Sequence, residues 1–338
     1  QAFHKLAPSL TRRIIMTGTP VDNRPYDTWS QIYFLDQGEA LGENFKEFKK
    51  SYDFTKSMAS NLIEQKVFAA SLKKLKNKID GFTLRETKAS CKINLPNKEY
   101  IRIETDFEEN QKNLYEKIKT EISIELKKEG KLTIDYLDFI AVKLLRLIQV
   151  SSNPATYDEG YTKVPPKIIE LKRLINEIPK DDKIIIWTHF IKSALSVEKH
   201  LEGFDVSTLH GELDLDKRNS LISNFKNNEK NRILIATFGT AKEGLTLTQA
   251  NHAIYFERNF SLSDYLQSQD RIHRISQVKT SYIYNLITKN SIEEWVEALV
   301  NTKHTAAQFI QGDITELEYN EQIDFNFNKI LEEILLEF

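Results

Sequence analysis

The sequence predicts an α/β fold in which helices cover both faces of a parallel sheet, preceded by a mainly helical first half. In the second half, short apolar runs of strand length alternate with amphipathic stretches of helical length. Apolar strands that alternate with helices are typical of a parallel sheet buried on both faces. Ligands of such sheets bind beyond the carboxyl ends of the strands, so we expect functional residues in the loops that follow them.

The elements of the second half follow from the apolar periodicity and from the turn residues between the runs. Strands are expected at 183–189, 206–209, 232–237, 252–257 and 282–286. Helices are expected at 193–201, 215–227, 262–274 and 292–300. The last residues are acidic and helical in character, and we expect them to pack back on the first half as a brace.

The first half combines short strands with long helices. Residues 14–16 predict a short buried strand that ends at turn residues, and a helix follows. Residues 45–80 and 108–150 have helical patterns, the second with a stripe of buried leucine and isoleucine. Residues 82–90 and 92–107 are predicted to form strand and loop pieces.

The length of 338 residues fits about two domains, at roughly 100 to 200 residues each. A Pro- and Gly-containing stretch at 151–167 is the best candidate for a linker. We therefore expect residues 1–106 to be the C-terminal remnant of a first lobe with a helical protrusion, and 107–162 to be a helical insertion and linker. Residues 163–301 would form the sheet lobe, and 302–338 a C-terminal helical brace.

Composition restricts the classes of function. Hydrophobic residues make up 40% and charged residues 28% of the sequence, the balance of a folded globular protein. No apolar run approaches the roughly 20 residues that cross a bilayer, and the first residues lack the apolar centre of a signal peptide. With a single cysteine as well, we expect a cytoplasmic protein with no membrane partner. The net charge of −2 gives no bulk attraction for nucleic acid, so any DNA contact has to be local.

The segment YLQSQDRIHRISQ carries the sharpest functional signal. Ser261, with Asp264 three residues later, predicts a capped helix start. On that helix Gln267, Arg271 and Arg274 follow at i, i+4 and i+7, so two guanidinium groups point the same way. A planar, permanent positive charge suits the stabilisation of a phosphoryl group during transfer. The alternative is an arginine pair engaged in surface ion pairs.

Small and hydroxylated residues near strand ends suit contacts with phosphate oxygens. At Gly239 and Gly244 the backbone amides can approach phosphate closely. Hydroxyls at Thr17, Thr188 and Thr237 can bond backbone phosphates without reading bases. Ordinary turn and cap bonding is the alternative for each hydroxyl. The histidines and the one thiol do not share metal-ligand spacing, so no metal site is expected on these residues.

Residues Gln267 to Gln277 resemble the sixth motif of the Swi/Snf-type (Snf-two) family of superfamily-two helicases, Q-A-x-D-R-x-H-R-x-G-Q, with two serines at the small positions. The resemblance implies that Arg271 and Arg274 reach across a cleft to ATP bound on another lobe, with Arg274 as the arginine finger. It also implies that the sheet lobe is the second of two RecA-like lobes, and that the first part of the chain is a remnant of the first.

Four further segments resemble motifs of this family in the family's order. IMTGTPVDN resembles the third motif, KIIIWTHF the fourth, LHGELDLDKRNSLISNF a segment with His-Gly, Arg and Phe, and ILIATFGTAKEGLTLTQAN the fifth. This resemblance implies that Gly244 and Leu245 contact the nucleotide. The residues that it implies for DNA contact are Thr17, Gly18, Thr188, His189, His210, Gly211, Arg218, Thr237, Lys242 and Thr246.

Two features depart from the family pattern. Neither a Gly-x-Gly-Lys-Thr loop nor an Asp-Glu-Ala-His box occurs in the 338 residues, and these motifs hold the outer phosphates of ATP and its magnesium. We therefore expect an N-terminal half-lobe, cut away or on another chain, to bind most of ATP and Mg²⁺, and this chain alone to be inactive. The stretch RNFSLSDY stands where many relatives have Trp-Asn-Pro, so remodelling partners are not implied.

The function implied by the resemblance is that of a DNA-dependent ATPase that moves along double-stranded DNA. We expect it in a prokaryotic cytoplasm with the nucleoid, or in the nucleus of a eukaryote. A second hypothesis is an ATPase-dead scaffold that docks on DNA or on a partner protein. A third is a strand-separating or RNA helicase, which the long helical insertions between the third and fourth motifs disfavour.

Overall fold

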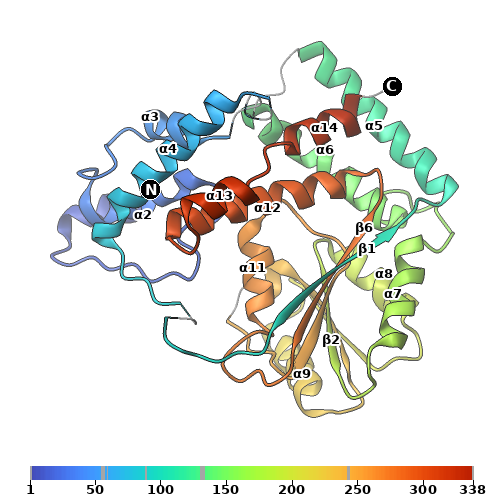
Figure 1. The fold of residues 1–338 in the computed structure, drawn as a ribbon. Coiled ribbons are helices and arrows are strands. Elements are labelled where there is room, and N and C mark those ends of the chain that lie inside the picture. Colours follow the sequence, from blue (N-terminus) through green and yellow to red (C-terminus); the bar gives the residue numbers. More distant parts are fainter. Residues whose placement is uncertain are drawn as a thin grey trace.

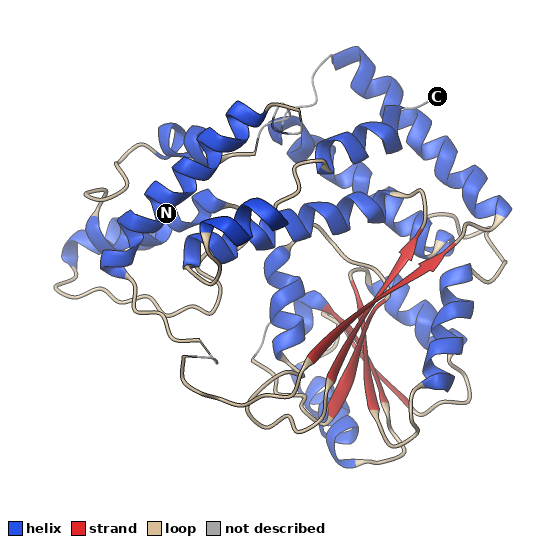
Figure 2. Cartoon of the chain, in the orientation of Figure 1, coloured by secondary structure: helices blue, strands red, loops and turns tan. Residues whose placement is uncertain are grey.

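A computed structural model describes residues 2–54, 58, 60–87, 90–129, 134–241 and 244–336. Its centre is a six-stranded sheet in the order β1-β6-β5-β2-β4-β3, with every neighbouring pair parallel. The strands run in one direction with helices on both sides (Figure 2), which confirms the predicted α/β fold. They are β1 (Lys98–Thr105), β2 (Lys183–Thr188), β3 (Val206–Leu209), β4 (Ile233–Thr237), β5 (Ala250–Tyr255) and β6 (Ser281–Thr288).

Alternate side chains of each strand enter separate cores on the two faces of the sheet. Ile184 and Ile186 of β2 pack with α7 (Pro166–Glu177) and α8 (Ile191–His200). Ile185 and Trp187 face the opposite side. That side is covered by α9 (Leu215–Asn227), α11 (Leu262–Asp270) and α12 (Ile292–Gln311). The near-continuous apolar runs of the sequence are therefore explained by burial on both faces.

Strand β1 lies at the edge of the sheet although it comes from the first third of the chain. It pairs with β6 in register from Lys98 with Ser281 to Thr105 with Thr288. Residues 98–105 thus complete the sheet of the second half. The four-part division of the chain stays a prediction.

Apart from β1, the first half is helical, as its sequence patterns predict. After short turns at α1 (Ala2–Leu6), η1 (Ala7–Ser9) and η2 (Pro25–Asp27), it forms α2 (Thr28–Asp36), α3 (Phe45–Tyr52) and α4 (Leu62–Ile79), and η4 (Asp80–Phe82) follows. Side chains of Asn44 and Asn61 accept backbone N–H groups at the starts of α3 and α4, which explains where these helices begin.

The C-terminal helices pack against the first half. In Figure 1 α12 and the red α13 (Glu316–Gln322) lie beside the blue α4, and the red α14 (Phe327–Leu336) packs against α12 and against α5 (Glu109–Glu129). Phe325 contacts Phe54 and Phe68 through its ring, and Lys73 pairs with Glu316 at 2.6 Å. These contacts join the two ends of the chain into one apolar core.

Helices α5 (Glu109–Glu129) and α6 (Ile134–Ser152) form the remaining hairpin, and the predicted stripe on α6 is buried at Leu144, Leu147 and Ile148. The first residues of the stretch predicted as a linker are packed against the rest of the protein. Its residues 151–153 are buried, and η5 (Pro154–Thr156) follows them directly. No helix in the described part of the chain has the length and apolar character needed to span a bilayer.

One strand expected in the first half is absent. Residues 14–16 have no regular structure, and Ile14 and Met16 are 81% and 93% exposed. A strand needs a neighbour to bond its backbone groups, and no described strand pairs with residues 14–16. The strand and loop pieces predicted between 82 and 107 are present, with loop at 83–87 and β1 at 98–105, while 88–89 lie outside the described residues.

A buried ion pair ties the start of α7 to the start of α12. The Lys167 ammonium is 1% exposed and donates to the carboxylate of Glu293 at 2.5 Å and to the carbonyl of Phe256 at 2.9 Å. The second oxygen of Glu293 accepts the N–H of Thr288 at 2.8 Å. Burial lowers the pKa of Lys167, and the Glu293 carboxylate opposes that shift. The pair thus fixes two helix starts at the carboxyl end of the sheet.

We predict that Lys167→Met lowers the free energy of unfolding by about 3 to 5 kcal/mol, because it leaves the Glu293 carboxylate buried without its cation. Urea unfolding followed by circular dichroism measures the change. The double variant Lys167→Met with Glu293→Gln removes both charges and should recover most of the loss. Equal stability of the wild type and the single variant would contradict the buried-pair assignment.

Candidate functional site

Helix α11 carries the predicted catalytic residues but ends earlier than the sequence predicts. It starts at the expected cap, where the hydroxyl of Ser261 accepts the N–H of Asp264 at 3.1 Å. It ends at Asp270, and Arg271 is its C-cap residue. Arg274 lies in the turns that follow the helix. The predicted helical stripe through both arginines is therefore wrong.

The helix ends in a tighter turn, in which the N–H groups of Arg271 and Ile272 donate to the carbonyls three residues earlier, at 3.3 and 3.1 Å. A second segment then bonds to the chain beyond this turn. The N–H of Leu247 donates to the carbonyl of Arg271 at 2.9 Å, the carbonyl that a longer helix would use internally. The amide of Gln277 donates to the carbonyls of Ile272 and Ala250 at 3.0 and 2.8 Å. These bonds fix the turn after α11 against the loop that leads into β5.

Both arginines nevertheless converge on that loop. The Nη1 of Arg274 donates to the hydroxyl of Thr246 at 2.6 Å, and the Nη1 of Arg271 lies 3.4 Å from the carbonyl of Leu245. Burial lowers the pKa of Arg271, and the neighbouring charge of Arg274 lowers it further. The Nε of Arg271 is buried with no hydrogen-bond partner among the described residues. The site is a concentration of positive charge with unused donor capacity.

The loop that faces the arginines is built around Gly244. Its φ of +67° lies in the left-handed region that a side chain disfavours, and the space beside its Cα is open. Tertiary contacts thus bring together five predicted residues: Gly244, Leu245, Thr246, Arg271 and Arg274. They lie toward the amino ends of β5 and β6, opposite to the end of the sheet at which we expected function.

The loop TGTP of the first half lies along α11. The side-chain oxygen of Asn23 accepts the N–H of Leu262 at 3.0 Å and so caps the free start of α11. The amide of Gln267 lies 2.9 Å from the hydroxyl of Ser263 and 3.5 Å from that of Thr19. Gln267 therefore connects the first half to the arginine helix, and Asn23 does so without having been singled out in the sequence.

A second group of predicted residues lies at the carboxyl ends of β2, β3 and β4, which are neighbours in the sheet. His189 and His210 directly follow β2 and β3. Arg218 of α9 donates to the carbonyl of Gly211 at 2.7 Å. Burial lowers the pKa of His189, which keeps its ring neutral near pH 7. These loops form one rim of the sheet, as the sequence predicts.

Two of the predicted hydroxyls in this rim point inward. Thr188 is fully buried with its hydroxyl 3.5 Å from the carbonyl of Phe190, and Thr237 is 5% exposed with its hydroxyl 2.7 Å from that of Thr240. In the first half, Thr17 accepts the N–H of Thr19 at 3.1 Å, and Gly18 is exposed. Local turn bonding thus occupies these hydroxyls. Lys242, also predicted for DNA contact, lies outside the described residues.

Glu257 organises the rim, and the sequence did not single it out as functional. Its carboxylate is 1% exposed and accepts the N–H groups of His189 and Phe190 at 3.1 and 3.0 Å. Hydroxyls of Ser193 and Ser152 also donate to it. Burial raises the pKa of Glu257, and these donors oppose the shift. An acidic residue at the end of an apolar run was the available signal.

Comparison with known proteins agrees with this arrangement. The model of the SNF2-related domain matches residues 4–155, and that of the helicase conserved C-terminal domain matches residues 166–276. The second match covers β2 to β5 and the arginine turn after α11.

Two proteins similar to this chain come from mycoplasmas. The uncharacterized ATP-dependent helicase MG018 of Mycoplasma genitalium is 28% identical over 328 residues, which cover 95% of this chain and 29% of the relative. An uncharacterized ATP-dependent helicase of Mycoplasma pneumoniae is 30% identical over 291 residues, covering 84% of this chain and 26% of the relative. The chain therefore spans less than a third of the length of either protein.

A solved structure extends the likeness to three dimensions. The Sulfolobus solfataricus SWI2/SNF2 ATPase core in complex with dsDNA is 26% identical, with a TM-score of 0.53, and the match covers 96% of this chain and 69% of that one. The family models, the relatives and the fold all indicate the same family. It is the family that the arginine motif in the sequence resembles. The chain belongs to the SNF2-related family, with an SNF2-related domain followed by a helicase conserved C-terminal domain.

Proposed function

We propose that this chain supplies the arginine side of an ATPase site in a motor that moves along double-stranded DNA. The observation that carries the proposal is the convergence of Arg271 and Arg274 on the loop at Gly244 to Thr246. Two guanidinium groups held together repel each other, so such an arrangement favours an anion between or before them. A nucleotide triphosphate on a facing half-lobe is that anion in this proposal.

The residues present fit one part of a bound ATP. The orphaned, buried Nε of Arg271 is a donor that a phosphate oxygen would satisfy. Among the described residues no group of three histidine, cysteine, aspartate or glutamate side chains gathers as a metal site. Following the family resemblance, we assign Mg²⁺ and the outer phosphates to the phosphate loop and acidic box of a facing half-lobe, on this or another chain. Without that half-lobe, this chain would not hydrolyse ATP.

The arginines would act by placing charge where it develops during phosphoryl transfer. Arg274 is the less buried of the two and is held by one hydroxyl, that of Thr246, so it can reorient toward a phosphate. Arg271 is more enclosed and would keep the loop carbonyl of Leu245 in place. In this proposal Arg274 is the arginine finger and Arg271 supports it.

The rim at the carboxyl ends of β2 to β4 is the proposed DNA surface. It offers the exposed Gly211 backbone and the side chains of His189, His210 and Arg218, which can meet backbone phosphates without reading bases. The Sulfolobus core is described in complex with dsDNA, which supports a duplex rather than RNA. Such a protein would be located where DNA is, in a prokaryotic cytoplasm or in a eukaryotic nucleus.

Communication between nucleotide and DNA would pass along α11. Its start is capped by Asn23 of the first half, and its end leads into the arginine turn. A shift of the first half on ATP binding would therefore move the helix that carries the arginines. Gln267, which contacts Thr19 of the first half, lies on the same helix.

In the full-length protein we predict that Arg274→Ala lowers DNA-stimulated ATP turnover by about a thousandfold, because the charge at the transferred phosphoryl group is lost. Duplex binding, measured by fluorescence anisotropy, should stay unchanged. Arg173→Ala is the matched control, since Arg173 forms exposed ion pairs with Glu170 and Glu177 on α7. Wild-type turnover in the Arg274 variant, or an equal loss in the control, would refute the finger.

We predict that Glu257→Gln raises the DNA concentration needed for half-maximal ATPase stimulation about tenfold. A neutral amide oxygen makes weaker hydrogen bonds to the N–H groups of His189 and Phe190, and the amide NH2 takes the place of the oxygen that accepts the hydroxyls of Ser152 and Ser193. The KM for ATP should not change, since the arginine site lies at the other end of the sheet. A parallel rise in the KM for ATP would indicate general misfolding instead of a displaced rim.

A further inference from the structure

Strand β1 leaves one side of the sheet open. It is the last strand in the sheet order, and within the described residues it pairs only with β6. An open edge offers unpaired N–H and C=O groups to any extended chain that lies beside it. At eight residues β1 is as long as β6, the longest of the other strands.

The register of β1 shows which backbone groups are open. The carbonyls of Asn97 and Thr105 accept the N–H groups of Ser281 and Lys289 across the pair with β6. In a parallel pair, alternate residues direct both backbone groups to the neighbouring strand. The odd-numbered residues of β1 therefore face β6. The N–H and C=O groups of Tyr100, Arg102 and Glu104 point away from the sheet.

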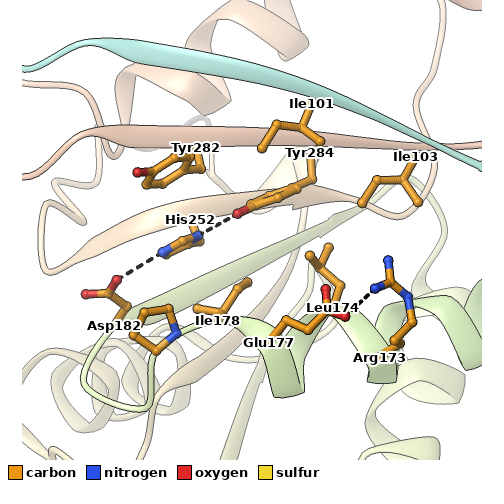
Figure 3. A pocket seen from close by; sticks show the side chains of 11 residues that line it. Ile101, Ile103, Arg173, Leu174, Glu177, Ile178, Asp182, His252, Tyr282 and Tyr284 are labelled. Atoms are coloured by element: carbon orange, nitrogen blue, oxygen red, sulfur yellow. Dashed lines mark hydrogen bonds and ion pairs between the residues drawn. The ribbon is translucent and has the colours of Figure 1, made fainter.

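The face of β1 toward α7 has an apolar, aromatic hollow of about 430 Å³. Figure 3 shows Ile101 and Ile103 of β1 above it, with Tyr282, Tyr284 and His252 forming a stacked wall. The charged groups at its margin already have partners: Glu177 pairs with Arg173, and Asp182 bonds to His252 at 3.1 Å. An apolar side chain fits this hollow.

The opposite face of β1 has a hollow of about 500 Å³ between β1, α12 and α14, and it is acidic. Arg102 of β1 enters it and pairs with Glu297 at 3.4 Å and with Glu294 at 3.7 Å. Arg258 bonds to Glu297 and Lys329 to Glu333 from outside the lining. Five carboxylates thus face three cations. The carboxylates are those of Glu294, Glu297, Asp324 and Glu333 in the lining and of Glu104 beside Arg102, and the cations are Arg102, Arg258 and Lys329. A basic side chain fits this hollow.

We propose that the open edge of β1 is a docking site for an extended segment of a partner protein whose side chains alternate between apolar and basic. The segment adds to the sheet as a seventh strand and bonds to the outward groups of Tyr100, Arg102 and Glu104. Because side chains of a strand alternate between faces, its apolar residues enter the hollow beside Ile101 and Ile103, and its lysines or arginines enter the acidic hollow.

The charges along β1 support this partner against two others. A second copy of β1 would bring its own Glu104 to the acidic hollow, so it fits that hollow less well than a segment whose residues on that face are all basic. Nucleic acid is repelled by the carboxylates of the acidic hollow. Main-chain bonds would supply affinity, and the two unlike hollows would supply the orientation and the specificity.

The test uses a fluorescein-labelled ten-residue peptide of alternating valine and lysine with the full-length protein. Saturable binding is expected, weakened about tenfold by Arg102→Pro, because proline removes an outward N–H while the bonds to β6 remain. Arg102→Ala is the matched control: it keeps the N–H and removes a cation from the acidic hollow, so binding stays equal or tightens. Equal binding to the proline variant, or no saturable binding to the wild type, would overturn the proposal.

Two further measurements keep the test decisive if the proline variant folds poorly. In the wild type, peptide should slow hydrogen exchange at the outward amides of Tyr100, Arg102 and Glu104 about tenfold. A valine and glutamate peptide should not compete, and Glu333→Lys should weaken the lysine peptide in a salt-dependent manner. Unchanged exchange at those three amides, or equal affinity for the glutamate peptide, rules the site out.

Discussion

A single backbone hydrogen bond, from the N–H of Leu247 to the carbonyl of Arg271, sets the geometry of the arginine site. Helix α11 ends at Asp270, and this bond holds the turn that follows, with both arginines, beside the loop at Gly244. Had α11 continued, Arg271 and Arg274 would lie almost one turn apart along a helix axis. The turn instead brings their charges to one place, with the hydroxyl of Thr246 holding the second.

Buried charge organises the opposite end of the sheet in a similar way. Glu257 holds the loop after β2 through two backbone N–H groups, and Lys167 with Glu293 fixes the starts of α7 and α12. A buried charge that loses its partner costs more than the pair contributes, so each of these loops has few alternative conformations. The proposed DNA rim is thus rigid for a physical reason, while the arginine site keeps one guanidinium that can move.

The family comparisons and the structure contribute differently. The matched models and relatives show which family the chain belongs to, and they cover the arginine turn. The match to the SNF2-related domain includes β1, but the open edge of β1 and the hollows on its two faces are visible only in the structure. They arise because a strand from the first third of the chain joins the sheet at β6. The edge is therefore a property of the topology and not of any motif.

The residues alone determined the alternation of strands and helices from 183 onward, since strands buried on both faces must be apolar along their whole length. They also located the start of α11 and the residues that meet around Gly244. Only the tertiary structure decided that 14–16 is not a strand, because a strand depends on a neighbour for its hydrogen bonds. It alone decided where the turn after α11 lies and that β1 forms the open edge of the sheet, because both depend on backbone partners far away in sequence.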